Sequence, residues 1–145
     1  MGYDPERLIL PKEPAFGDLP VPTEEQEQAY IFQWAEIMAF QVPELELLHH
    51  IPNGGMRSKA EAVRFKRTGV KAGVPDLCLP VARKGYHGLY IELKRQKGGK
   101  LSEDQKKWLD DLFAQGYLAV RCDGADEAIG ILSNYLGVKE GIEQW

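Results

Sequence analysis

The chain has 145 residues and a net charge of −4 at pH 7, and 43% of its residues are hydrophobic. This is the composition of one globular, soluble domain, large enough to bury a single core without disulfides. No stretch approaches the ~18 apolar residues of a membrane helix, and the start, MGYDPERLIL, is not a secretory signal, so we expect a cytoplasmic protein with no membrane segment.

The N-terminal part predicts an arm followed by a helix. Residues 1–22 carry five of the nine prolines and should form an extended arm. A helix is expected from a cap at Thr23 to about Gln41, because Gln26 completes a capping box with Thr23. Pro43 should end it. Its run AYIFQWAEIMAF is apolar around most of the circumference, which predicts burial on more than one side.

The rest of the chain predicts alternating strands and helices. Residues 46–51 could form a short strand before a turn at 52–55, and Ser58 with Glu61 opens a short helix that stops at Gly69. There follow strands at 74–81 and 89–95, a mobile turn at 97–100, a helix from the Ser102–Gln105 capping box to about 115, a strand at 117–122, a helix at 125–136 and a tail at 139–145. The order α-β-α-β-β-α-β-α predicts an α/β fold. Cys78 and Cys122 lie in apolar, strand-like runs and should be small buried residues rather than a disulfide.

Positive charge is concentrated in the middle of the chain. Residues 57–107 hold 14 of the 18 lysines and arginines and carry a local charge of +9, whereas residues 1–56 carry −8 and residues 108–145 carry −5. A basic region with its own acidic residues is what a site that cleaves phosphodiesters needs. The alternative is a solvated basic face without a partner.

Glu92 and Lys94 form the centre of the predicted site. The segment LYIELK alternates with a period of two, so Leu89, Ile91 and Leu93 should share one face of a strand. Glu92 and Lys94 then share the other face. An E-x-K tripeptide can also be an ion pair on a solvated strand face, which is the plainer interpretation.

Asp76 supplies the second predicted carboxylate. If strand 74–81 pairs with strand 89–95, Asp76 and Glu92 can face each other, and two carboxylates that close stay ionised only with a cation between them. Mg²⁺ suits oxygen ligands and a substrate phosphate, and it lowers the pKa of a bound water. Lys94 would orient that water or stabilise the charge that develops on the phosphorus centre. A Pro-Asp dipeptide is otherwise an ordinary turn.

These motifs resemble the virus-type replication-repair nuclease family (VRR-NUC) of the PD-(D/E)xK superfamily, over about residues 23–136. The resemblance implies a restriction-endonuclease-like core, in which a mixed central sheet is flanked by helices. It also implies DNA cleavage that depends on Mg²⁺ or Mn²⁺ and, for small stand-alone members, a homodimer that acts on branched DNA such as four-way junctions. The matching residues are Glu24, Gln28, residues 51–55 (IPNGG), Arg57, residues 69–77 (GVKAGVPDL), residues 91–94 (IELK), Leu101, Ser102, Gln105, Trp108, Gly116 and Tyr117.

Carried over by position, the resemblance makes Asp76 and Glu92 metal ligands together with the Leu93 carbonyl, and it makes Lys94 the catalytic lysine. The family's glutamate on the first helix corresponds best to Glu24, with Glu27 as the next candidate. Either could instead be an ordinary acidic residue in the first turn of a helix.

Several further residues have two interpretations. Gln105 lies at the site in the family pattern, but in the bare sequence it is the third residue of a capping box, and a side chain that reaches the Ser102 amide should not also reach the site. His50 could contact DNA or be structural. The expected DNA contacts are His50, Asn53 and Gly54 in a turn, Arg57 beside that turn, Arg64, Lys66 and Arg67 on the short helix, and Lys71.

From the sequence and this resemblance we expect an intracellular DNA endonuclease, encoded by a phage or prophage, with a nuclease domain at 23–138 between the arm and the tail. A small restriction-type endonuclease remains an alternative, and so does a DNA-binding subunit that retains the fold without catalysis. An HNH-type nuclease is excluded because His49, His50 and His87 lack the spacing of that metal site.

Overall fold

The computed structural model describes residues 19–52 and 58–138. Its elements follow the predicted order and confirm the α/β fold. They are α1 (Glu24–Met38), the 3₁₀ helix η3 (Pro43–Leu47), β1 (His49–His50), α2 (Lys59–Arg67), β2 (Leu77–Leu79), β3 (Leu89–Lys94), α3 (Glu103–Ala114), β4 (Leu118–Asp123) and α4 (Ala125–Leu136).

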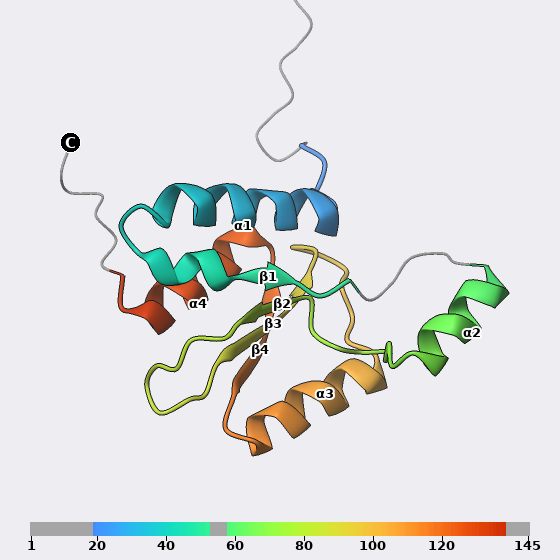
Figure 1. Cartoon of the computed structure of the whole chain (residues 1–145). Helices are drawn as coiled ribbons and strands as arrows, with labels where there is room; N and C mark the ends of the chain where they lie inside the picture. The colour runs from blue at the N-terminus through green and yellow to red at the C-terminus, as the bar shows by residue number, and fades with distance from the viewer. Residues whose placement is uncertain (1–18, 53–57, 139–145) are drawn as a thin grey trace, which may run out of the picture.

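The four strands form one mixed sheet in the order β1-β2-β3-β4. The pairs β1–β2 and β2–β3 are antiparallel, whereas β3 and β4 are parallel. A parallel pair needs a crossover, and α3 supplies it between β3 and β4. Figure 1 shows α1 and α4 over one side of the sheet, α3 on the other side and α2 standing apart from both layers.

The alternation along β3 separates the core from the site. Leu89, Ile91 and Leu93 are at most 1% exposed and lie in the hydrophobic cluster together with residues of α1 and α4. Glu92 and Lys94 occupy the opposite face, as predicted, and that face is buried as well, with 2% and 8% exposure. The interpretation of Glu92 and Lys94 as an ion pair on a solvated face is therefore wrong.

The first helix differs from the prediction in length and burial. It begins after Thr23, whose capping box with Gln26 is formed, but it ends at Met38. Only Glu27, Ile31 and Ala35 of this helix are buried. One side faces the sheet and α4, and no described part of the chain covers the other side, where Ile37 is 70% exposed. Burial on several sides was thus a wrong expectation.

Two predicted strands are shorter than expected. The first helix ends at Met38, before Pro43 is reached, and Pro43 instead begins η3, so strand β1 is reduced to two residues. Strand β2 starts only at Leu77. Pro75 has no N–H to donate to a neighbouring strand. The Leu93 amide donates to the side chain of Asp76 and not to a backbone carbonyl of β2.

Both cysteines are buried thiols without a disulfide, as predicted. Burial raises the pKa of the Cys122 thiol to about 12, so it is not a reactive nucleophile. No helix within the described residues is long and apolar enough to span a membrane.

Candidate active site

Asp76 and Glu92 meet across strands β2 and β3. Leu77 pairs with Ile91 in the antiparallel ladder, which places the preceding Asp76 opposite Glu92. One carboxylate oxygen of Asp76, Oδ2, accepts a hydrogen bond of 2.8 Å from the Leu93 amide. The predicted pairing of these strands and the shared face of the two carboxylates are both found.

The backbone around Asp76 is fixed from two sides. Its carbonyl accepts from the Ile51 amide at 2.7 Å and lies 2.8 Å from Nδ1 of His50. Gly73 precedes it with φ +90°, and a Cβ there would lie 2.6 Å from the Asp104 carbonyl carbon in the first turn of α3. Only glycine combines this dihedral angle with this close approach, so Gly73 allows the Asp76 loop to lie against α3.

Glu92 is the most buried charged side chain of the site. Its Oε1 accepts a 2.8 Å hydrogen bond from the Gln105 amide and lies 3.7 Å from the Lys94 ammonium. Its Oε2 is buried and has no hydrogen-bond partner within the described residues. Burial and the neighbouring Asp76 carboxylate raise the pKa of Glu92 to about 8, although Lys94 opposes the shift.

Gln105 performs both of the roles that the sequence set against each other. Its Oε1 accepts from the Ser102 amide at 2.9 Å, which completes the capping box of α3. Its Nε2 donates to Glu92 from the other end of the same amide group. Capping of α3 and contact with Glu92 are therefore compatible, because a primary amide has an acceptor and a donor that point in different directions.

An open cavity of about 570 Å³ lies beside Asp76 and Leu93. It joins α1 to the strand ends, and its lining is acidic and polar apart from Pro52 and Leu93. The residues that line it are Glu24, Glu25, Gln28, His50, Pro52, Asp76 and Leu93. Gln28 was identified from the sequence as a family match without an assigned role; its position one helical turn after Glu24, on the same face of α1, is the signal that places it at the cavity.

The glutamates in the first turn of α1, Glu24, Glu25 and Glu27, lie in different surroundings. Glu24 and Glu25 line the cavity, and the charge of Glu24 contributes to the raised pKa of Glu92. Glu27 instead is buried and accepts hydrogen bonds from the Ala125 amide and from Gln96 Nε2. It therefore serves the junction of α1 with the first turn of α4, and Glu24 lies at the cavity whereas Glu27 does not.

Comparison with known proteins agrees with this geometry. The family profile described as the VRR-NUC domain matches residues 21–126. The chain belongs to the VRR-NUC family. A solved structure titled "VRR_NUC domain protein" is 36% identical, covers 83% of this chain and 93% of its own, and superposes with a TM-score of 0.72. No curated protein matches the chain.

VRR-NUC domains are nucleases of the PD-(D/E)xK type, and the acidic cavity of this member fits the metal dependence that is general in the family. The oxygens of Asp76 and Glu92 are hard ligands of the kind that Mg²⁺ prefers, and an ion would give the buried Glu92 Oε2 a partner. Within the described residues, no three histidine, cysteine, aspartate or glutamate side chains form a metal-binding group on their own.

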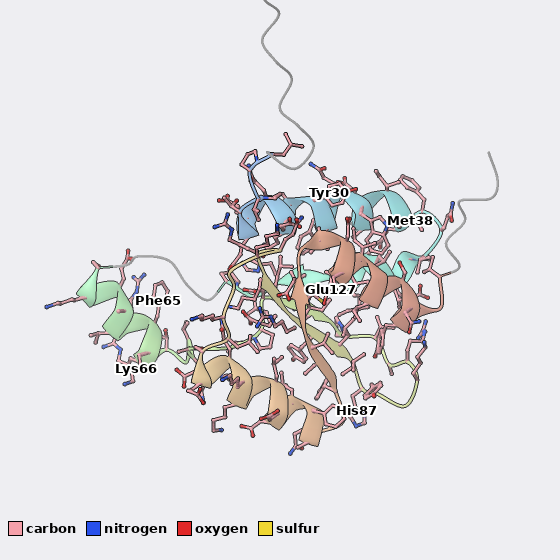
Figure 2. The ribbon with its side chains drawn as sticks, turned by 180° about the vertical axis from the view of Figure 1, so that it is seen from behind. Tyr30, Met38, Phe65, Lys66, His87 and Glu127 are labelled. Atoms are coloured by element: carbon pink, nitrogen blue, oxygen red, sulfur yellow. The ribbon has the colours of Figure 1, made fainter. Side chains whose placement is uncertain are left out.

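The predicted DNA contacts of this VRR-NUC domain lie in different places. His50 is at the cavity, where its ring binds the Asp76 carbonyl. Arg64, Lys66 and Arg67 are exposed on α2, away from the cavity, and Figure 2 shows Lys66 and Phe65 on this outlying helix. Lys71 is exposed at a groove next to Trp108 of α3. Asn53, Gly54 and Arg57 lie outside the described residues.

Proposed function

We propose that residues 23–138 form an endodeoxyribonuclease that uses Mg²⁺ or Mn²⁺ to hydrolyse phosphodiester bonds in branched DNA. The observation that carries the proposal is the buried Oε2 of Glu92, which lacks a partner within the described residues and lies beside a second carboxylate, Asp76. A buried, unpartnered carboxylate oxygen is costly to maintain unless a ligand completes it.

The ion would be held by Asp76, Glu92 and the Leu93 carbonyl, with Glu24 completing the set from α1. The chemistry that a bound ion would supply there is polarisation of a phosphoryl oxygen and a lower pKa of a bound water. The hydrogen bond from the Leu93 amide to Oδ2 of Asp76 holds this carboxylate in place beside Glu92.

Lys94 is the proposed catalytic lysine. Its ammonium lies 3.7 Å from Glu92 Oε1 on the same face of β3, so it can donate a hydrogen bond to the attacking water or to the phosphate oxygen on which charge develops. Hydrolysis adds the water oxygen to phosphorus, breaks one P–O bond and returns a proton to the leaving oxygen. Gln105 supports this step by holding Glu92 from α3.

DNA would be held by the positive charges beyond the cavity. Arg64, Lys66 and Arg67 on α2 and Lys71 after it are exposed and suit phosphate contacts, which position the substrate without reading its sequence. His50 and the segment with Asn53, Gly54 and Arg57 would contact the phosphates nearest the ion.

The proposed active form is a two-fold homodimer. A four-way junction must be cut at two symmetric positions, and a C₂ pair of these domains supplies two equivalent sites. Two exposed apolar residues support this: Ile37 on α1 is 70% exposed and Phe40 in the turn after α1 is 92% exposed. Phe40 also lines a groove of about 520 Å³ between α1 and η3.

A substrate panel tests the proposal. Four-way, flap, duplex and single-stranded DNA would be incubated with the protein and Mg²⁺, Mn²⁺ or EDTA. We expect cuts at symmetric positions in the four-way junction with either metal and none in EDTA. Equal activity on linear duplex would contradict the branched specificity, and cleavage in EDTA would contradict the metal requirement.

A further inference from the structure

The loop that follows β3 lies directly over Lys94. A Cβ on Gly99 would be 2.8 Å from Cβ of Lys94 and 3.4 Å from its Cγ and Cδ. The backbone of the loop therefore contacts the aliphatic stem of the lysine, and the whole residue Lys94 is only 8% exposed. The turn at 97–100, which we expected from the sequence to be mobile, packs against Lys94 and covers its side chain.

One side chain of the neighbouring strand holds this cover. Arg121 on β4 donates from Nη2 to the Gly99 carbonyl at 2.8 Å and from Nε to Asp123 Oδ1 at 2.8 Å. In the parallel ladder Arg121 pairs with Glu92 and Asp123 pairs with Lys94, so both groups lie on the face of the sheet that carries the site. The bond to Asp123 orients the guanidinium, and the second bond fixes the loop.

We propose that Arg121 is a positioning residue for Lys94: it holds Gly99 against the lysine stem and so keeps the ammonium directed at Glu92. A lysine side chain has a flexible four-carbon stem, and its direction is defined only if the surroundings exclude its other rotamers. The close contact between the loop and the lysine stem requires glycine at position 99, because the Cβ of any other residue would lie 2.8 Å from Cβ of Lys94. The inference rests on the proposed nuclease function only in what Lys94 does once it is held.

The experiment uses the full chain and compares Arg121→Met, Arg121→Lys and Gly99→Ala with the parent protein. Arg121→Met removes both hydrogen bonds, and Arg121→Lys keeps a donor for the Gly99 carbonyl. Gly99→Ala displaces the loop while residue 121 remains arginine. Two controls match the changes: Arg83→Met, whose arginine pairs with Glu44 on a distant surface, and Gly130→Ala, where a Cβ meets nothing within 4 Å.

The first measurement does not require activity. Lysines are acetylated by a brief pulse of N-hydroxysuccinimidyl acetate, and mass spectrometry compares Lys94 with the exposed Lys106. We expect Arg121→Met and Gly99→Ala to label Lys94 about tenfold faster, as expected for a group released from local protection. In Arg121→Lys the labelling rate of Lys94 should lie between the rates of these two variants and that of the parent. In both controls it should equal the parental rate.

The second measurement is cleavage under saturating DNA. We expect kcat to fall by roughly 10- to 100-fold in Arg121→Met and Gly99→Ala, the range for a displaced catalytic group, while the Kd for DNA without metal stays at the parental value. Arg121→Lys should recover part of the activity. A melting curve for each variant shows that it is folded, and if Arg121→Met does not fold, Gly99→Ala decides alone.

The outcomes separate the two proposals. Parental labelling of Lys94 in folded Gly99→Ala or Arg121→Met would overturn the positioning role. A loss of DNA affinity in Arg121→Met with unchanged labelling would also overturn it, since the arginine would then contact DNA. If even the parent cleaves no DNA but Lys94 labels faster in both variants, the nuclease proposal fails while the role of Arg121 in holding the loop stands.

Discussion

The side-chain amide of Gln105 donates to Oε1 of Glu92 over 2.8 Å while it also caps its own helix. One residue therefore couples the start of α3 to the carboxylate at the centre of the site. A second complete capping box, Thr23 with Gln26 on α1, has the same local chemistry but serves the start of its own helix.

This pair of boxes gives a matched test of Gln105. In Gln105→Glu the side chain can still accept from the Ser102 amide, but it cannot donate to Glu92 and adds a negative charge beside it. We expect cleavage to fall by about 100-fold with little change in the melting temperature. Gln26→Glu is the control and should cleave at the parental rate. If both variants lose activity equally, the effect belongs to helix capping and not to the site.

Asp76→Asn tests the metal ligand. The amide oxygen of asparagine can still accept from the Leu93 amide, so the fold should persist, but the negative charge that faces the ion is removed. We expect cleavage with Mg²⁺ to fall by ~10²-fold or more and DNA binding without metal to be retained. The exposed Asp110→Asn on α3 is the matched control. Cleavage at the parental rate by Asp76→Asn would show that the site is assigned wrongly.

The raised pKa of Glu92 predicts a pH dependence of stability in the metal-free protein. The folded state binds a proton up to a pKa of about 8, whereas the unfolded glutamate loses it near 4.5. The folded state thus holds more protons in this window, and the free energy of unfolding should decrease as the pH rises through it.

Denaturant unfolding in EDTA at several pH values between 4.5 and about 8 measures this decrease. Glu92→Gln should flatten the curve, because the neutral side chain no longer titrates. Addition of Mg²⁺ to the parent protein should raise the free energy of unfolding again near pH 8, because an ion that binds only the folded state stabilises the folded state. A parental curve that is already flat in EDTA would contradict the burial of an ionisable Glu92.

The basic residues of α2 should contribute affinity without specificity. Replacing Arg64, Lys66 and Arg67 by glutamine should weaken the binding of all DNA sequences alike and reduce the slope of log K against log salt by roughly 0.9 for each phosphate that is no longer neutralised. Stability should change little, because α2 buries none of its residues. The double variant Arg83→Gln, Lys84→Gln is the control. An unchanged slope in the triple variant would place the DNA surface elsewhere.

The exposed apolar residues Ile37, on α1, and Phe40, in the turn after it, give a prediction about assembly. Phe40→Glu and Ile37→Glu should dissociate the proposed dimer into monomers of 16.3 kDa, because a charge on each copy would be buried at the shared interface. Sedimentation equilibrium at micromolar concentration measures the mass, and Glu25→Gln serves as a control on the opposite end of the helix. A parent protein that already sediments as a monomer would reject the dimer.

The sequence predicted the order of elements and the central strand because both depend on local patterns. The period-two alternation of LYIELK identified the two faces of β3, and capping residues located the starts of α1 and α3. Helix α1 was predicted as more buried than it is, since an apolar helix face does not reveal whether another element covers it. The separation of Glu24 from Glu27 depended on the position of α4, about one hundred residues along the chain, which no local pattern contains. Arg121 was missed because its partners, Gly99 and Asp123, become its neighbours only through the parallel pairing of β3 with β4.

Helix α2 carries much of the proposed DNA-binding charge but contributes no buried residue to the fold. The sequence of α2 is therefore under almost no constraint from packing. In β3, by contrast, Leu89, Ile91 and Leu93 lie in the hydrophobic core, so a substitution there changes the packing. Selection can alter the length, charge or orientation of α2 while the catalytic sheet remains intact. An engineer could likewise exchange this helix between related domains to transfer a preference for one DNA shape, without having to redesign the hydrophobic interior.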